Sequence, residues 1–72
     1  MILVTGPTGY VGRQVVEALI SSGRPVRALV HMPSRASVLS AYDAEIVYGD
    51  VLDPESLRRA CSGVEAVVYL VA

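Results

Sequence analysis

The chain has 72 residues, of which 53% are hydrophobic, and a formal net charge of −1. A chain of this length forms at most one small domain, and its charge excludes the basic surface to which nucleic acids bind. No apolar run approaches the roughly 18 residues of a membrane span, and the one cysteine, Cys61, cannot form an internal disulfide. We therefore expect a cytoplasmic protein. We expect no nucleic acid, membrane or metal as a partner.

The first elements along the chain are a strand, a glycine-rich turn and an amphipathic helix. The branched apolar run Ile2–Thr5 predicts a strand buried on both faces, and the turn Gly6–Gly12 follows it directly. Apolar residues recur at helical spacing over Tyr10–Ser22, and Gly23 then ends the helix. Glycines at such a turn let a ligand approach the backbone, and the helix start offers free amides and a positive dipole. This arrangement predicts a site for the pyrophosphate of a dinucleotide.

Strands and helices continue to alternate over the rest of the chain. The expected strands are Val26–Val30, Glu45–Tyr48 and Ala66–Val71, and the expected helices are Arg35–Ala41 and Pro54 to about Cys61. Alternating units of this kind predict a parallel sheet with right-handed crossovers. The fold class is therefore α/β, a three-layer Rossmann-like domain with strand order 3-2-1-4 and helices on both faces. Residues 1–72 form only the first part of a doubly wound fold, so part of the sheet and the edge of the fourth strand stay uncovered.

Two alternatives compete with a dinucleotide site at the glycine-rich turn. The phosphate loop of nucleoside triphosphatases has four residues between its glycines and ends in Gly-Lys-Ser/Thr. Here Arg13-Gln14 follows Gly12, and all six basic residues of the chain are arginine, which excludes that loop. The second alternative is a turn with a purely structural role, because glycine-rich turns have many structural roles.

The end of the second expected strand indicates which dinucleotide is preferred. An acidic residue about 20 positions past the glycine motif binds the ribose 2′-hydroxyl of NAD, and none is present there. Residues 31–35 read His-Met-Pro-Ser-Arg, so His31 and Arg35 are candidates to face a 2′-phosphate. We therefore expect NADP as the cofactor, with NAD less favoured, and an NADP affinity that rises as His31 gains a proton. The alternative for His31 is an ordinary loop histidine.

Several segments resemble one known family in the right order. Thr5–Gly12 resembles the TGxTGxxG element of atypical and extended short-chain dehydrogenases/reductases, with the NmrA-like and isoflavone-reductase-like branches closest. The resemblance continues through Val26–Val30, Gly49–Pro54 and Val67–Ala72, so it covers the whole chain. It implies an NAD(P)-binding Rossmann domain and an oxidoreductase that transfers hydride.

The resemblance also implies roles for individual residues. The residues expected around the pyrophosphate are Gly6, Thr8, Gly9, Tyr10, Val11 and Gly12. Asp50 and Val51 are expected to hold the adenine, although a solvated turn carboxylate is the alternative for Asp50. Leu70 and Ala72, at the end of the fourth strand, are expected beside the adenine ribose and the nicotinamide.

The absence of lysine limits what the chain can do alone. Reductases of this class use a tyrosine with a lysine three to four residues beyond it, so no catalytic residue is assigned here. The favoured hypothesis is the cofactor-binding N-terminal portion of an NADP-preferring oxidoreductase, inactive without its catalytic and substrate-binding part. The alternative is a non-catalytic NmrA-like module for dinucleotide sensing or protein interaction. Either one is expected to self-associate through the fourth strand or the uncovered sheet face.

Overall fold

The structure is a computed structural model that describes residues 1–70, and it contains one parallel four-stranded sheet. The elements in chain order are β1 (Ile2–Thr5), α1 (Tyr10–Ser21), β2 (Val26–Val30), the 3₁₀ helix η1 (Pro33–Leu39), β3 (Glu45–Tyr48), α2 (Pro54–Ala60) and β4 (Ala66–Tyr69). The sheet has the order β3-β2-β1-β4, and every neighbouring pair is parallel. The expected Rossmann-like order 3-2-1-4 is therefore confirmed.

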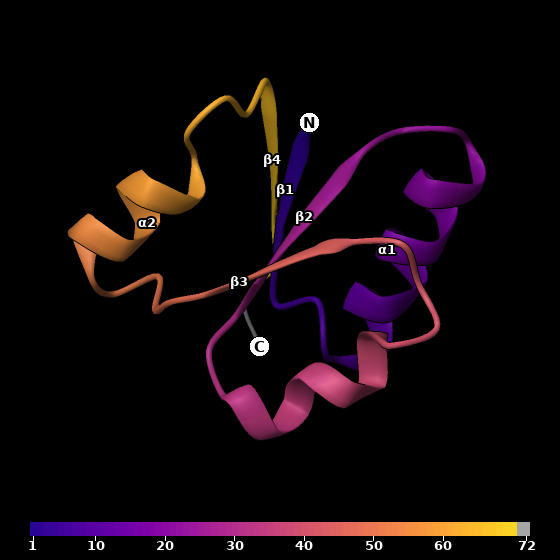
Figure 1. Ribbon diagram of the computed structural model, residues 1–72, viewed down its shortest axis with the longest axis horizontal. Helices are drawn as coiled ribbons and strands as arrows, with labels where there is room; N and C mark the ends of the chain where they lie inside the picture. The colour runs from indigo at the N-terminus through magenta and orange to yellow at the C-terminus, as the bar shows by residue number, and fades with distance from the viewer. Residues whose placement is uncertain (71–72) are drawn as a thin grey trace.

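Helices cover both faces of the sheet, as expected for a three-layer fold. Helices α1 and η1 lie on one face and α2 lies on the other, with the sheet seen edge-on between them (Figure 1). On the first face, Val16 of α1 packs with Val4 and Val26, and Leu39 of η1 packs with the neighbouring part of β2. On the second face, Ala60 of α2 packs with Leu3 and Leu29. Alternate residues of each strand therefore point to opposite layers.

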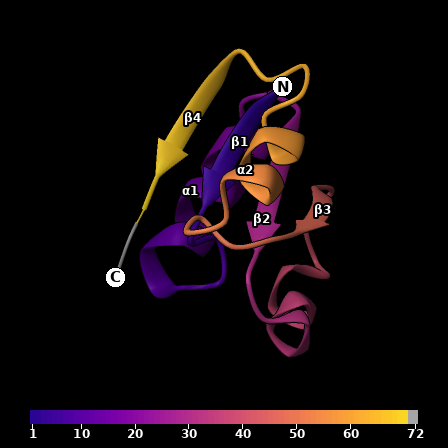
Figure 2. The same cartoon turned by 90° about the vertical axis from the view of Figure 1, so that its left-hand side faces the viewer.

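The sheet is buried at its centre and open along β4. All four residues of β1 are buried, whereas Val67 and Tyr69 of β4 are 47% and 60% exposed. Register pairs Leu3 with Val67, so Val67 and Tyr69 belong to the face that α2 covers elsewhere. Figure 2 shows β4 along one side of the molecule, with α2 over β1 and β2 instead. The expected open edge and uncovered part of the sheet are both present.

The short helix after β2 differs from its sequence-based prediction in position and type. It spans Pro33–Leu39 as a 3₁₀ helix, whereas the sequence predicted a helix over Arg35–Ala41. Proline suits the first position because its ring fixes φ and the amide that it lacks would have no helical partner. The Arg35 amide donates to the carbonyl of Met32 at 2.8 Å, which is the tighter i to i+3 pattern.

The other boundaries agree closely with the sequence pattern. Gly23 and Gly63 have φ of +84° and +73°, the left-handed conformation expected just after a helix. Asp53 is the N-cap of α2, and its side chain accepts the Glu55 amide at 3.2 Å. Strand β4 ends at Tyr69, and the predicted continuation to residue 71 lies partly outside the described residues. None of the helices within residues 1–70 is long and apolar enough to cross a membrane.

Candidate functional site

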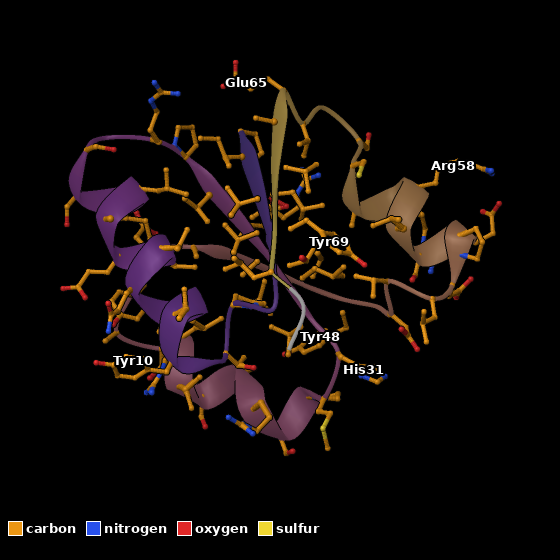
Figure 3. All side chains as sticks on the ribbon, turned by 180° about the vertical axis from the view of Figure 1, so that it is seen from behind. Tyr10, His31, Tyr48, Arg58, Glu65 and Tyr69 are labelled. Carbon is orange, nitrogen blue, oxygen red and sulfur yellow. The ribbon has the colours of Figure 1, made fainter. Side chains whose placement is uncertain are left out.

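The carboxyl ends of the four parallel strands meet at one edge of the sheet. The glycine-rich turn follows β1, His31 follows β2, Asp50 follows β3 and Leu70 follows β4. Figure 3 shows His31 near this end of the molecule and Glu65, which precedes β4, at the opposite end. Open α/β sheets bind ligands in the crevice outside the carboxyl ends of their strands. The predicted site residues therefore collect where this fold usually places a ligand.

The three glycines of the turn have different structural roles. Gly6 has φ of +66°, and a Cβ atom on it would collide with the carbonyl of Leu70. A Cβ on Gly12 would collide with the carbonyl of Gly6. A Cβ on Gly9, in contrast, would lie 3.8 Å from its nearest neighbour, and the φ of Gly9 is −75°. The fold needs Gly6 and Gly12, whereas the space beside Gly9 is left open.

Helix α1 begins at this open space without a side-chain cap. Its N-cap residue is Gly9, which offers no hydrogen-bonding side chain, and its first turn contains no acidic residue. The first amides of a helix have no partner inside the helix, and the helix dipole makes this end positive. A 12-residue helix that starts in this way can bind the oxygens of a phosphate group.

Two adjoining pockets lie at this edge of the sheet. The first pocket has a volume of about 240 Å³ and is lined by Thr5, Gly6, Pro7, Thr8, Leu29, His31, Met32, Arg35, Gly49, Asp50, Val51 and Leu70. The second pocket has a volume of about 640 Å³ and is lined by Gly6, Thr8, Gly9, Tyr10, Val11, Gly12, Arg35, Tyr69 and Leu70. Four residues line both pockets: Gly6, Thr8, Arg35 and Leu70. The shared residues make the two pockets one elongated site that passes the start of α1.

The structure brings together every sequence-predicted site residue that it describes. His31, Asp50 and Val51 line the first pocket only, and the residues from Gly9 to Gly12 line the second. The remaining predicted residues, Gly6, Thr8, Arg35 and Leu70, line both pockets. Ala72, also a predicted site residue, lies outside the described residues.

Sequence reasoning missed six residues that line the pockets: Thr5, Pro7, Leu29, Met32, Gly49 and Tyr69. Thr5 and Tyr69 are the last residues of β1 and β4, so the rule that ligands bind at the carboxyl ends of strands could have found them. Thr5 also has a structural role, because its buried Oγ1 accepts the Leu70 amide at 3.0 Å. This bond holds Leu70 next to the glycine-rich turn.

Two contacts connect elements across the site. Nε2 of His31 lies 3.5 Å from Oδ2 of Asp50, although the sequence assigned these residues to different parts of the cofactor. Nη2 of Arg35, on η1, donates to the carbonyl of Thr8 in the glycine-rich turn at 3.5 Å. These contacts place an imidazole, a guanidinium and a carboxylate around the first pocket. Residues 1–70 contain no cluster of three or more His, Cys, Asp or Glu side chains that could hold a metal ion.

Comparison with known proteins defines the class of this fold and then its family. The chain is similar to a short-chain dehydrogenase/reductase superfamily protein from Agrobacterium tumefaciens with bound NAD, with 44% identity, a TM-score of 0.79, and coverage of 100% of this chain and 20% of that one. It is also similar to the NADPH-dependent quinone oxidoreductase QOR2 from Escherichia coli complexed with NADPH, with 32% identity, a TM-score of 0.87, and coverage of 100% and 26%. The fold is therefore Rossmann-like and of the kind found in short-chain dehydrogenases/reductases.

The family follows from the sequence itself. The family model described as the NmrA-like family matches residues 1–72, so the chain belongs to the NmrA-like family. A curated relative is the photosystem II assembly factor Ycf39 from Cyanophora paradoxa, 39% identical over 67 residues, which are 93% of this chain and 21% of that protein. The expected NmrA-like resemblance is confirmed, and the chain spans between about a fifth and a quarter of the length of these relatives.

Proposed function

We propose that this chain is the dinucleotide-binding portion of an NADP-preferring oxidoreductase that transfers hydride. The observation that carries the proposal is the open space beside Gly9, at the uncapped start of α1 and in the wall of the second pocket. The structure gives no packing reason for a glycine at this position, and close approach of a pyrophosphate supplies one. The NAD and NADPH bound by the two structural relatives support the same ligand class.

The proposed residue roles follow the two pockets. The pyrophosphate lies against the turn Gly6–Gly12, including Thr8, Tyr10 and Val11, where backbone amides face the ligand. The adenine occupies the first pocket beside Val51, where Asp50 provides a hydrogen-bond acceptor. The nicotinamide side of the cofactor extends past Leu70 and Tyr69, and Ala72 is proposed there on its sequence position alone.

The preference for NADP is proposed from the charges around the first pocket. His31 and Arg35 both line it, and β2 is not followed by the acidic residue that binds the 2′-hydroxyl of NAD. A guanidinium and an imidazole N–H can both donate hydrogen bonds to an additional phosphate. NAD remains the second candidate cofactor.

The division between binding and catalysis is also part of the proposal. When bound, the cofactor would supply the hydride, and this chain would bind and orient the cofactor. The 72 residues contain no lysine and therefore no tyrosine–lysine pair of the kind used by short-chain reductases. We expect the 72-residue chain alone to bind the dinucleotide without oxidising or reducing it. We also propose that the protein is cytoplasmic.

A non-catalytic role is the second candidate function. It is favoured by the similarity to a protein named as an assembly factor rather than as a reductase. In that case, the intact protein binds the dinucleotide and does not oxidise NADPH with any electron acceptor. Tight NADPH binding together with NADPH oxidation by quinones or other carbonyl substrates supports the oxidoreductase instead.

Gly9→Ala tests the binding site itself. The added methyl group has space in the free protein, so we expect the unfolding temperature to fall by only a few degrees. The same methyl group separates a pyrophosphate from the backbone, and we expect the dissociation constant for NADPH to rise about tenfold or more. Calorimetric titration of both proteins measures this change. Unchanged NADPH affinity in a folded Gly9→Ala variant contradicts the proposed site.

A further inference from the structure

The two pockets at the carboxyl edge of the sheet differ in how many elements enclose them. The first pocket is lined by residues that follow all four strands and by residues of η1. The second pocket is lined by the glycine-rich turn, the start of α1 and the end of β4, with Arg35 of η1 where the two pockets meet. Among residues 1–70, none that lines the second pocket comes from β2, from β3 or from the loop after β3. The first pocket therefore offers a ligand contacts from more sides.

The side chains of the two pockets also differ in burial. Thr5 and Leu29, in β1 and β2, line the first pocket and are only 1% and 4% exposed. In the second pocket, Tyr10, Val11 and Tyr69 are 74%, 60% and 60% exposed. An exposed side chain keeps its rotational freedom, and a ligand that orders it loses affinity through that entropy. The first pocket is therefore better preorganised for binding than the second.

The loop after β3, which forms one wall of the first pocket, is fixed in the free protein. The Asp50 amide donates to Oγ of Ser56, a buried residue of α2, at 3.0 Å. A Cβ added to Gly49 would lie 3.0 Å from the side chains of Ser56 and Leu29, so α2 and β2 pack closely against this loop. A wall that is already in place lowers the entropic cost of binding.

The second pocket ends at an edge of the sheet. Strand β4 is the outermost strand on this side, and within residues 1–70 no strand pairs with its free edge (Figure 2). Tyr69 and Leu70 are the residues at the end of β4 that line the second pocket. A ligand group that extends past the start of α1 therefore meets this chain on one side only.

We propose that the ligand class of this chain is esters of adenosine 5′-diphosphate in general, and that the nicotinamide ring adds little to their affinity. This inference rests on the proposed function, which assigns the adenine to the first pocket and the pyrophosphate to the start of α1. Those two groups contact the preorganised part of the site. The nicotinamide ring extends into the part that β4 bounds on one side. The chain therefore binds ADP-ribose about as tightly as it binds NAD.

One consequence concerns the redox state of the cofactor. NADPH and NADP⁺ differ only in the nicotinamide ring, and a protein responds to two ligands differently only when its contacts with them differ. A chain that scarcely contacts the ring binds both forms with equal affinity. In the non-catalytic role, this chain then reports the total concentration of the cofactor and not its redox state.

The test is calorimetric titration of this chain with pairs of ligands. ADP-ribose is compared with NAD⁺, and 2′-phospho-ADP-ribose with NADP⁺, so that only the nicotinamide differs within each pair. We expect the two dissociation constants of each pair to agree within about threefold, and those of NADPH and NADP⁺ to agree equally well. We expect nicotinamide mononucleotide to bind at least about a hundredfold more weakly than ADP-ribose.

Two variants show whether both ligands of a pair use the same site. Gly9→Ala is expected to weaken ADP-ribose and NAD⁺ by the same factor, about tenfold or more, because both carry the pyrophosphate. Gln14→Ala is the matched control, since Gln14 is exposed on the same helix and lines neither pocket. We expect Gln14→Ala to leave all of these affinities unchanged. Thermal unfolding of each variant confirms that it is folded before its affinities are compared.

The possible failures are distinguishable. If the dinucleotides bind but removal of the nicotinamide weakens binding by more than about threefold, this inference is wrong and the proposed function stands. A difference of more than about threefold between NADPH and NADP⁺ contradicts the inference in the same way. If neither the dinucleotides nor ADP-ribose bind, the proposed function fails and the inference fails with it.

Discussion

The guanidinium of Arg27, the second residue of β2, donates from Nη1 to the carbonyl oxygen of Ala60 at the end of α2, at 2.7 Å. The same nitrogen donates to the carbonyl of Ser62 at 2.7 Å, and Nε of Arg27 lies 3.0 Å from Oε1 of Glu45 on β3. A cation at a helix C-terminus is favourable because the last carbonyls have no helical partner and the dipole is negative there. One side chain thus fixes α2 onto two strands of the sheet.

Arg27→Met removes this connection, and we expect a loss of about 2 kcal/mol in the free energy of unfolding, since charge-assisted bonds in a mostly buried position are lost. Urea unfolding followed by circular dichroism measures the change. Arg24→Met is the matched control, because Arg24 is exposed and substitutions at such positions cost less than about 0.5 kcal/mol. Equal losses in the two variants would contradict the role of Arg27.

Gly12→Ala and Gly9→Ala are expected to separate folding from binding. The methyl group of Gly12→Ala meets the backbone of Gly6, which cannot move aside as a flexible side chain can. We expect a loss of about 3 kcal/mol or more for Gly12→Ala. Gly9→Ala is expected to cost less than about 1 kcal/mol, the usual range for an N-cap exchange. Denaturant unfolding measures the loss in the free energy of unfolding of both variants. A larger loss for Gly9→Ala than for Gly12→Ala would refute this assignment.

Ser56→Ala tests the support of the loop after β3. It leaves the Asp50 amide without its acceptor, and we expect a cost of about 1–3 kcal/mol in stability. If Ser56 positions the adenine side of the site, Ser56→Thr restores the hydroxyl and recovers NADPH affinity more than Ser56→Ala does. Ser37→Ala, at an exposed position of η1, serves as the control. NADPH affinity that is equal in Ser56→Ala and the unmodified protein would limit Ser56 to a structural role.

Arg35→Gln tests the origin of the NADP preference. Arg35 lines both pockets, so it can face either the 2′-phosphate or the pyrophosphate. If it faces the 2′-phosphate, we expect the NADPH dissociation constant to rise about tenfold and that of NADH to change less than about threefold. Parallel titrations with the two cofactors measure this difference, with Arg59→Gln on the exposed side of α2 as the control. Equal losses for both cofactors would assign Arg35 to the pyrophosphate.

Self-association is expected through β4 in the 72-residue chain. Val67 is exposed on the uncovered sheet face, and β4 is an open edge that can pair with another strand. Val67→Lys is expected to shift sedimentation velocity profiles toward a monomer, because a lysine on an edge strand disfavours pairing. Tyr48→Lys, at an exposed position of the opposite edge strand β3, is the control. A folded monomer of the unmodified chain at high concentration would refute this expectation.

Local patterns in the sequence predicted most of the fold. Alternation of apolar runs with helix signals predicted the order of the elements, and right-handed crossovers together with the strand order of dinucleotide-binding folds then predicted the sheet order. The prediction failed locally at η1, where the serines and Pro33 favour tight turns and no helical pattern marks the boundary. The site was predicted in outline, because the glycine-rich turn is a contiguous segment and its ligand class follows from backbone chemistry.

The sequence by itself determined the kind of fold, the glycine-rich turn and the absence of an acid after β2, since these depend on neighbouring residues and short-range backbone geometry. Only the tertiary structure decided that Asp50 lies against His31. The two residues follow different strands, and the register that pairs Val30 with Tyr48 carries the ends of β2 and β3 to the same place. The tertiary structure likewise decided that Gly9, alone among the three glycines of the turn, has free space. Contacts between distant segments depend on how strands pair and helices pack, which are relations between segments and not properties of any one segment.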